Sequence, residues 1–242
     1  MSARRPSGPT SSASPAHAGP AHADGGAGRA QATHPADAAP TSPAPPARST
    51  VLPGRQSPLL PTPGDHVVLG TPLDGPWPQG TEVIYLAGGC FWGMQKFLDQ
   101  FDGVVETEVG YANGNGVEPT YQQVSKANTG HAETVKVLYD EAKLPLRRLL
   151  ERYFMAIDPF SRDRQGGDYG RQYRTGIYYT DPAQQEAIRE VCAAVEEKEG
   201  KTLAVEVLSI DNFSRAEEFH QKYLDKNPGG YCHIPERLLK LQ

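Results

Sequence analysis

Prolines crowd into the first third of the chain, and this uneven distribution limits where a fold can form. Sixteen of the 22 prolines lie in residues 1–80, among tracts of Ala, Ser, Gly and His. Proline removes a backbone donor, and such tracts carry too little apolar surface to offset the entropy lost on ordering. We therefore expect residues 1–64 to form a disordered extension rich in Pro, Ala and Ser.

The remaining residues, 65–242, have the composition of one catalytic domain of common size, with the aromatic residues, the β-branched runs and most of the charge. Its first part, residues 65–80, mixes apolar residues with prolines and predicts an extended segment on the domain surface. Residues 1–80 hold five Arg against four Asp, so the domain carries the acidity of the chain. Neither part has the basic patch of a nucleic-acid-binding protein.

The chain has no stretch that approaches the roughly 18 apolar residues of a membrane span, and its N-terminus lacks the apolar core of a secretory signal. We expect a soluble, monomeric, cytoplasmic protein without membrane contact. An organelle-targeting peptide is the alternative, because Arg4 and Arg5 lead an acid-poor stretch rich in Ser and Ala. The prolines there oppose the amphipathic helix that such a peptide needs.

Strand and helix patterns alternate through the domain without internal repeats. Apolar alternation predicts strands at 83–87, 104–111, 132–139, 177–179 and 205–210. Helical spacing predicts helices at 91–101, 146–157 and from Asp181-Pro182 to Gly200, and Ser214 with Glu217 forms a capping box before a helix to about Leu224. We expect an α/β (α+β) two-layer sandwich, with helices packed on a mixed sheet and an irregular C-terminal tail.

Three cysteines, Cys90, Cys192 and Cys232, are too few for a disulfide scaffold, and no pair has zinc-ligand spacing. Cys90 follows Gly88-Gly89, where a strand passes into a helix N-terminus, and the helix dipole and free N–H groups there favour a thiolate and lower the thiol pKa. Cys90 is thus a candidate nucleophile, although a lone cysteine is more often a small buried hydrophobic residue.

The string Gly88-Gly89-Cys90-Phe91-Trp92-Gly93 is long and specific, and core packing gives no reason for it. Further motifs follow in order: Gly110-Tyr111, Pro119–Tyr121, Thr129–Glu133, Arg164–Asp168, Gln172–Arg174 and Lys226–Cys232. Together, over about residues 65–233, they resemble the A-type peptide methionine sulfoxide reductases. The resemblance implies reduction of methionine sulfoxide to methionine, free and in proteins, with selectivity for the S epimer and a role in repair of oxidised proteins.

The resemblance also implies roles for single residues. Glu133 matches the family's proton donor, which suits its position on the apolar face of a predicted strand because burial raises a carboxyl pKa. Tyr121 and Tyr173 match tyrosines that hydrogen-bond the sulfoxide oxygen, and Asp168 matches an acid that organises polar contacts beside them. Phe91 and Trp92 resemble the apolar pocket for the substrate methyl group.

The catalytic cycle that the resemblance implies uses two thiols. Cys90 becomes a sulfenic acid, Cys232 in the turn-rich tail resolves it to a disulfide, and a thioredoxin-like dithiol reduces that disulfide. Such a cycle needs no metal and no organic cofactor. Cys192 shares a helix face with Ile188, Val191 and Val195, which predicts a packing role.

Two other functions are consistent with a reactive Cys90. One is a thiol hydrolase that pairs Cys90 with His131 or His220, and it would need an imidazole to activate the thiol. The other is a redox sensor without turnover, with the N-terminal extension as an interaction tether.

Overall fold

The structure, a computed structural model, describes residues 77–241. The extension predicted at 1–64 and most of the segment predicted at 65–80 lie outside the described residues. Within those residues, no helix is long and apolar enough to cross a membrane.

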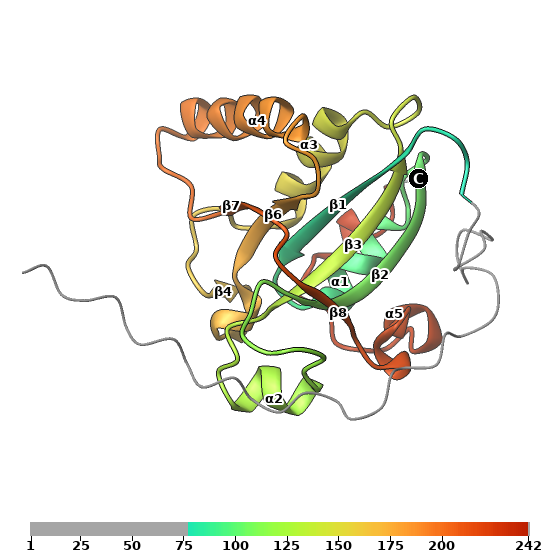
Figure 1. Cartoon of the computed structure of the whole chain (residues 1–242), viewed down its shortest axis with the longest axis vertical. Coiled ribbons are helices and arrows are strands. Elements are labelled where there is room, and N and C mark those ends of the chain that lie inside the picture. The colour runs from blue at the N-terminus through green and yellow to red at the C-terminus, as the bar shows by residue number, and fades with distance from the viewer. Residues whose placement is uncertain (1–76, 242) are drawn as a thin grey trace, which may run out of the picture. The chain divides into compact units, whose positions relative to one another are not determined.

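A six-stranded mixed sheet forms the centre of the described part (Figure 1). In spatial order its strands are β7 (Glu206–Ser209), β6 (Thr175–Tyr179), β1 (Thr81–Gly88), β3 (Ala132–Asp140), β2 (Val104–Ala112) and β8 (Phe213–Arg215). β6 and β7 run parallel, and the other neighbouring strands run antiparallel. A separate short hairpin joins β4 (Arg164–Gln165) to β5 (Asp168–Tyr169).

Three helices, α1 (Phe91–Leu98), α3 (Leu146–Ala156) and α4 (Gln184–Glu199), pack their apolar side chains into one core with the sheet. On β3 this core contains Val135 and Val137. A smaller cluster contains Ala132 of β3 together with Ala87, Ala112 and Tyr178 of the other strands. Successive strand residues point to opposite faces, so the two clusters lie on opposite sides of the sheet. The expected two-layer α/β architecture is confirmed.

Short helical segments complete the chain and carry several residues of the motifs. They are α2 (Tyr121–Lys126), α5 (Tyr223–Lys226) and the 3-10 turns η1 (Arg171–Tyr173), η2 (Glu218–His220) and η3 (Glu236–Leu238). α2 was not predicted as a helix, yet it begins with a capping box. The Thr120 side chain accepts from the Gln123 N–H, and the Gln123 side chain accepts from the Thr120 N–H. The tail after α5 is largely irregular, as expected.

The predicted capping box at Ser214 and Glu217 is wrong. Ser214 lies in β8, which pairs with β2. Glu217 accepts hydrogen bonds from the Tyr121 N–H at 3.0 Å and the Tyr111 hydroxyl at 2.8 Å. Because these two tertiary partners engage the Glu217 carboxylate, it does not cap a helix. The chain forms the 3-10 turn η2 in place of the predicted helix.

Two other helix ends differ from the prediction. α1 ends at Leu98, before Phe101. α4 begins at Gln184, because the Asp181 carboxylate accepts from the Ala183 N–H at 2.8 Å within the turn that precedes the helix. Gly200, with φ +65°, ends α4 as predicted.

Candidate active site

The turn between β1 and α1 has no space for side chains at its two glycines. A Cβ on Gly88 would lie 2.2 Å from Met94 Cε, and a Cβ on Gly89, at φ +82°, would lie 2.6 Å from the Gln165 Cβ. Glycine alone meets both requirements at low cost. The turn delivers Cys90 to the N-cap of α1, the position predicted for it.

Cys90 is only 7% exposed, and its thiol pKa is raised, contrary to the expectation from the helix terminus. Burial is the largest cause, and the nearby Glu133 carboxyl adds to it. The N–H groups of Trp92 and Gly93 do lower the thiol pKa as predicted, but they are outweighed. The resting site therefore holds Cys90 as a neutral thiol.

Glu133 lies on β3 and is 2% exposed. Its Oε2 atom accepts a hydrogen bond of 3.1 Å from the backbone N–H of Phe91, the residue after Cys90. Burial raises the Glu133 pKa to about 8; the Phe91 N–H opposes this rise, and the nearby Asp168 adds to it. A carboxyl group with this pKa is mostly protonated at neutral pH, so the site holds a proton donor beside a nucleophile.

Three separate segments bring further predicted residues to this site: α2 carries Tyr121, η1 carries Tyr173 and β5 carries Asp168. Burial, followed by the Glu133 charge, raises the pKa of both tyrosine hydroxyls, and Cys90 and Asp168 act on both in the same direction. For Tyr121, a hydrogen bond with Tyr173 opposes the rise. Both hydroxyls are thus neutral donors at physiological pH. The Oδ2 atom of Asp168 is buried without a hydrogen-bond partner among the described residues.

The two aromatic residues after Cys90 differ in exposure. Phe91 is 1% exposed and contacts the rings of Tyr111 and His220, so it belongs to the core and supports the site from behind. Trp92 is half-buried and stacks on Tyr223 at a centroid distance of 3.8 Å. Of the pair predicted to bind the methyl group, Trp92 is therefore the one that retains surface for a ligand.

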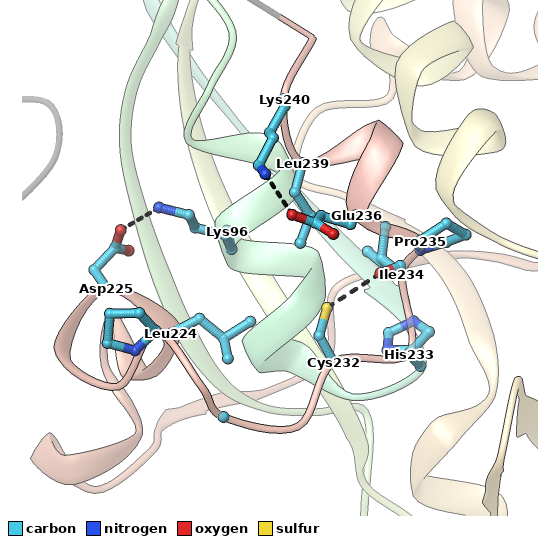
Figure 2. A pocket seen from close by; sticks show the side chains of 12 residues that line it. Lys96, Leu224, Asp225, Cys232, His233, Ile234, Pro235, Glu236, Leu239 and Lys240 are labelled. Carbon is cyan, nitrogen blue, oxygen red and sulfur yellow. Dashed lines mark hydrogen bonds and ion pairs between the residues drawn. The ribbon is translucent and has the colours of Figure 1, made fainter.

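Cys232 docks on the first turn of α1. Its Sγ lies 2.9 Å from the position that a Cβ on Gly93 would occupy, and its thiol donates to the Ile234 carbonyl at 3.5 Å. His233 lies beside it, with Nε2 3.0 Å from the Gly88 carbonyl oxygen. Figure 2 shows Cys232 and His233 on the wall of a pocket that Lys96 and Asp225 also line. Both thiols that the predicted cycle needs are free and lie at one end of α1.

The third cysteine, Cys192, is half-buried and packs against the main core from α4. Burial raises its thiol pKa to about 11, and the nearby Glu196 adds to this. The structure therefore agrees with the packing role predicted from the sequence.

The histidines of the hydrolase alternative are engaged elsewhere. His131 Nδ1 pairs with Thr129 Oγ1 at 2.9 Å, and His220 Nδ1 accepts from Trp92 Nε1 at 3.0 Å. Burial lowers the pKa of each imidazole to about 4, so both are neutral at pH 7. The charged groups that act on the Cys90 thiol are instead the carboxyl groups of Glu133 and Asp168. This arrangement suits proton donation more than thiolate activation by an imidazole.

Comparison with known proteins decides the family. A sequence model described as "Peptide methionine sulfoxide reductase" matches residues 82–241. The chain belongs to this family. The relative named "Peptide methionine sulfoxide reductase MsrA" from Lachnoclostridium phytofermentans is 54% identical over 153 residues, which cover 63% of this chain and 92% of that protein. The same name is carried by a Corynebacterium kroppenstedtii protein, 43% identical over 77% of this chain and 89% of its own length.

Solved structures agree with this A-type assignment. "Methionine sulfoxide reductase A of Corynebacterium diphtheriae" is 35% identical to this reductase with a TM-score of 0.66, over 76% of this chain and 96% of that one. Reduced Mxr1 from Saccharomyces cerevisiae is 34% identical with a TM-score of 0.62, over 66% and 93% respectively. The resemblance inferred from the motifs is confirmed at the level of family and fold.

Several contacts in this reductase's site were not predicted, and His220 was considered only as a partner of Cys90 in a hydrolase. His220 and Tyr223 support Trp92, burial and then Asp168 raise the pKa of Tyr231, and His233 contacts the Gly88 carbonyl. All four come from the segment after β8, which has no regular periodicity. Tyr231 belongs to the Lys226–Cys232 motif and the other three lie near it, but the motif does not specify these contacts.

Proposed function

We propose that this reductase acts on the S epimer of methionine sulfoxide, free and in proteins, with Cys90 as nucleophile and Glu133 as acid. The observation that carries the proposal is the buried Glu133 carboxyl, with its pKa near 8, bonded to the N–H next to Cys90. Family membership supports the reaction type.

The first step moves one oxygen atom. The Cys90 sulfur attacks the sulfoxide sulfur, the sulfoxide oxygen is protonated by Glu133, and the oxygen ends on Cys90 as a sulfenic acid while methionine leaves. The proton of the Cys90 thiol returns to Glu133, so protons balance. The Cys90 thiol and the Glu133 carboxyl are both protonated at rest, so the site already holds the two protons that these transfers require.

The polar and apolar neighbours position the substrate. We assign the hydroxyls of Tyr121 and Tyr173 to hydrogen bonds with the sulfoxide oxygen, and Asp168 to ordering the polar contacts beside them. Trp92, supported by Phe91, packs on the substrate methyl group, because aromatic faces attract sulfur and exclude water. The assignment of the two tyrosines and Asp168 is supported by the electrostatic influence of Cys90 and Asp168 on both hydroxyls.

The later steps return the enzyme to its thiol form. The Cys232 thiol attacks the Cys90 sulfenic acid, which releases water and leaves a disulfide. A thioredoxin-like dithiol then exchanges with the disulfide, becomes oxidised itself, and restores both thiols. Electrons come from thiols throughout, so we propose that the reaction uses no metal or organic cofactor. The described residues contain no group of three possible metal ligands.

We further propose that the enzyme works as a monomer in the cytoplasm, on oxidised proteins in need of repair. Three cysteines are too few for the disulfide scaffold of a small secreted protein, which suits a reducing compartment. The N-terminal extension, residues 1–64, is proposed to take no part in the chemistry.

The test is an assay of separated S and R epimers of a methionine sulfoxide peptide with dithiothreitol and the full-length chain. We expect sustained turnover of the S epimer alone. Equal rates on both epimers would contradict the assignment of epimer, and binding without turnover would favour the sensor function. Replacing both His131 and His220 would abolish a hydrolase, whereas reduction should persist with a higher KM, because His220 supports Trp92.

A further inference from the structure

A small polar pocket is formed by residues that are near neighbours in sequence of Tyr121, Glu133 and Tyr173. It has a volume of about 130 Å³ and is formed by three segments, residues 124–128, 130–131 and 171–172. Ser125, Asn128 and Gln172 supply polar side chains to its wall. None of the proposed reaction steps uses this pocket.

The charge of the pocket is opposite to that of the chain. The chain carries a net charge of −5, yet the residues that line the pocket include Lys126 and Arg171 and no acidic residue. Neither of these two side chains forms an ion pair within residues 77–241. The buried Arg174 adds positive potential nearby, since its charge lowers the pKa of His131. Such a pocket favours an anion.

His131 adds a hydrogen-bond donor that lacks a partner. The side chain is 1% exposed, and its Nε2 atom is buried with no partner among the residues described. Its Nδ1 pairs with the Thr129 hydroxyl, which can donate to it, and Nε2 then carries the proton. An unsatisfied buried N–H is costly, so this group gains from an acceptor reaching the pocket.

Each of the three pocket segments lies close in sequence to one of the proposed site residues. Tyr121 opens α2, and Lys126 closes that helix about 7.5 Å further along its axis. His131 precedes Glu133 by two residues, which is about 7 Å in extended chain. Arg171 and Tyr173 are the two ends of η1. A group bound in the pocket would therefore sit within the reach of the residues next to a bound methionine sulfoxide.

We propose that this pocket is a subsite for a carboxylate of the substrate, paired with Lys126 and Arg171. Two sources share this chemistry: an acidic side chain one or two residues from the oxidised methionine, and the α-carboxylate of free methionine sulfoxide. The inference rests on the proposed function and gives it a substrate preference for acidic surroundings.

The first experiment compares kcat/KM for capped S-sulfoxide peptides that carry Glu or Gln at each position up to two residues from the methionine. We expect a Glu to Gln ratio of about 3 to 10 at the best position, through KM, falling toward 1 at high salt. The double variant Lys126→Gln, Arg171→Gln should bring the ratio to about 1. Lys198→Gln, which removes an exposed cation from α4, should keep the wild-type ratio.

A second experiment compares free methionine sulfoxide with its amide in the wild type and in the double variant. If the amide loses the lower KM that depends on Lys126 and Arg171, the α-carboxylate is the group bound in the pocket. Equal KM values for the acidic and neutral substrates in the wild type, or a preference that survives the double variant, would overturn the subsite. Lack of turnover on every S-sulfoxide peptide would instead contradict the proposed function, so the two failures are distinguishable.

Discussion

The Sγ atom of Cys232 occupies the space that a side chain on Gly93 would need, since a Cβ there would lie 2.9 Å away. Gly93 is in the first turn of α1, three residues beyond Cys90. The absence of a side chain therefore allows the tail to bring the proposed resolving thiol onto the helix turn that carries the nucleophile. Figure 2 shows the Cys232 thiol directed along the tail toward the Ile234 carbonyl.

Gly93→Ala should separate the two halves of the cycle. Alanine favours the helix by about 1 kcal/mol over glycine, so the fold should be retained, but its methyl group displaces Cys232. We expect one round of sulfoxide reduction at near the wild-type rate and disulfide formation slowed by about tenfold or more. Trapping of the Cys90 sulfenic acid with dimedone, followed by mass spectrometry over time, measures both steps. Disulfide formation at the wild-type rate would show that this contact is unimportant.

Glu133→Gln should lower the rate of sulfenic acid formation by roughly 10²- to 10⁴-fold, the usual effect of a positioned acid. Only the protonated form of Glu133 donates a proton, and its pKa is about 8. The wild-type rate should therefore be constant up to about that pH and fall above it. The variant should lack this alkaline fall, because an amide does not titrate. Single-turnover rates between pH 6 and 10 test this. An unchanged rate in the variant would remove Glu133 from the mechanism.

The strands and long helices were predictable because their burial follows simple periods. Val135 and Val137 recur on β3 with the two-residue period of a strand, and α3 keeps Leu146, Leu149 and Leu150 on one buried stripe. Glu133 shares the period of its strand neighbours, so its burial, and with it the direction of its pKa shift, could be inferred from the sequence.

Features set by tertiary contacts could not be inferred in this way. Glu217 has the spacing of a capping residue, but Tyr111 and Tyr121 bind its carboxylate. The pKa of Cys90 depends on the balance between two helix N–H groups and the burial of the thiol, and only the former is visible in the sequence. The contacts of Cys232 with α1 cross about 140 residues of chain and have no local signal.

Deleting residues 1–60 should leave turnover and thermal stability nearly unchanged. The sequence of this stretch offers no periodic apolar face with which to dock on the domain. Steady-state kinetics and melting curves of the truncated and full-length chains provide the comparison. A large drop in either quantity would mean that the extension contributes to the fold or to the site.

Glu106→Gln should change how stability depends on pH. Glu106 accepts from Trp77 Nε1 at 3.0 Å, and burial, followed by the Glu108 charge, raises its pKa to about 7 from an unfolded value near 4.5. The folded state binds the proton more tightly, so this carboxyl makes the protein less stable as pH rises from about 4.5 to 7. Glutamine does not titrate, so the melting temperature of the variant relative to that of the wild type should rise between pH 4.5 and 7. A difference independent of pH would contradict this.

Cys232→Ser and Cys192→Ser should behave differently, because only Cys232 lies on the helix turn that holds Cys90. A disulfide needs its two Cα atoms within about 7 Å, and we expect the turn-rich tail segment before Cys232 to let it reach that range. Cys232→Ser should complete one round of sulfoxide reduction, leave Cys90 as sulfenic acid and lose thioredoxin-driven turnover. Cys192→Ser should keep full turnover and lose only some packing on α4. Mass spectrometry after one equivalent of substrate distinguishes these outcomes. A Cys90–Cys192 disulfide in the wild type would show that the resolving thiol is wrongly assigned.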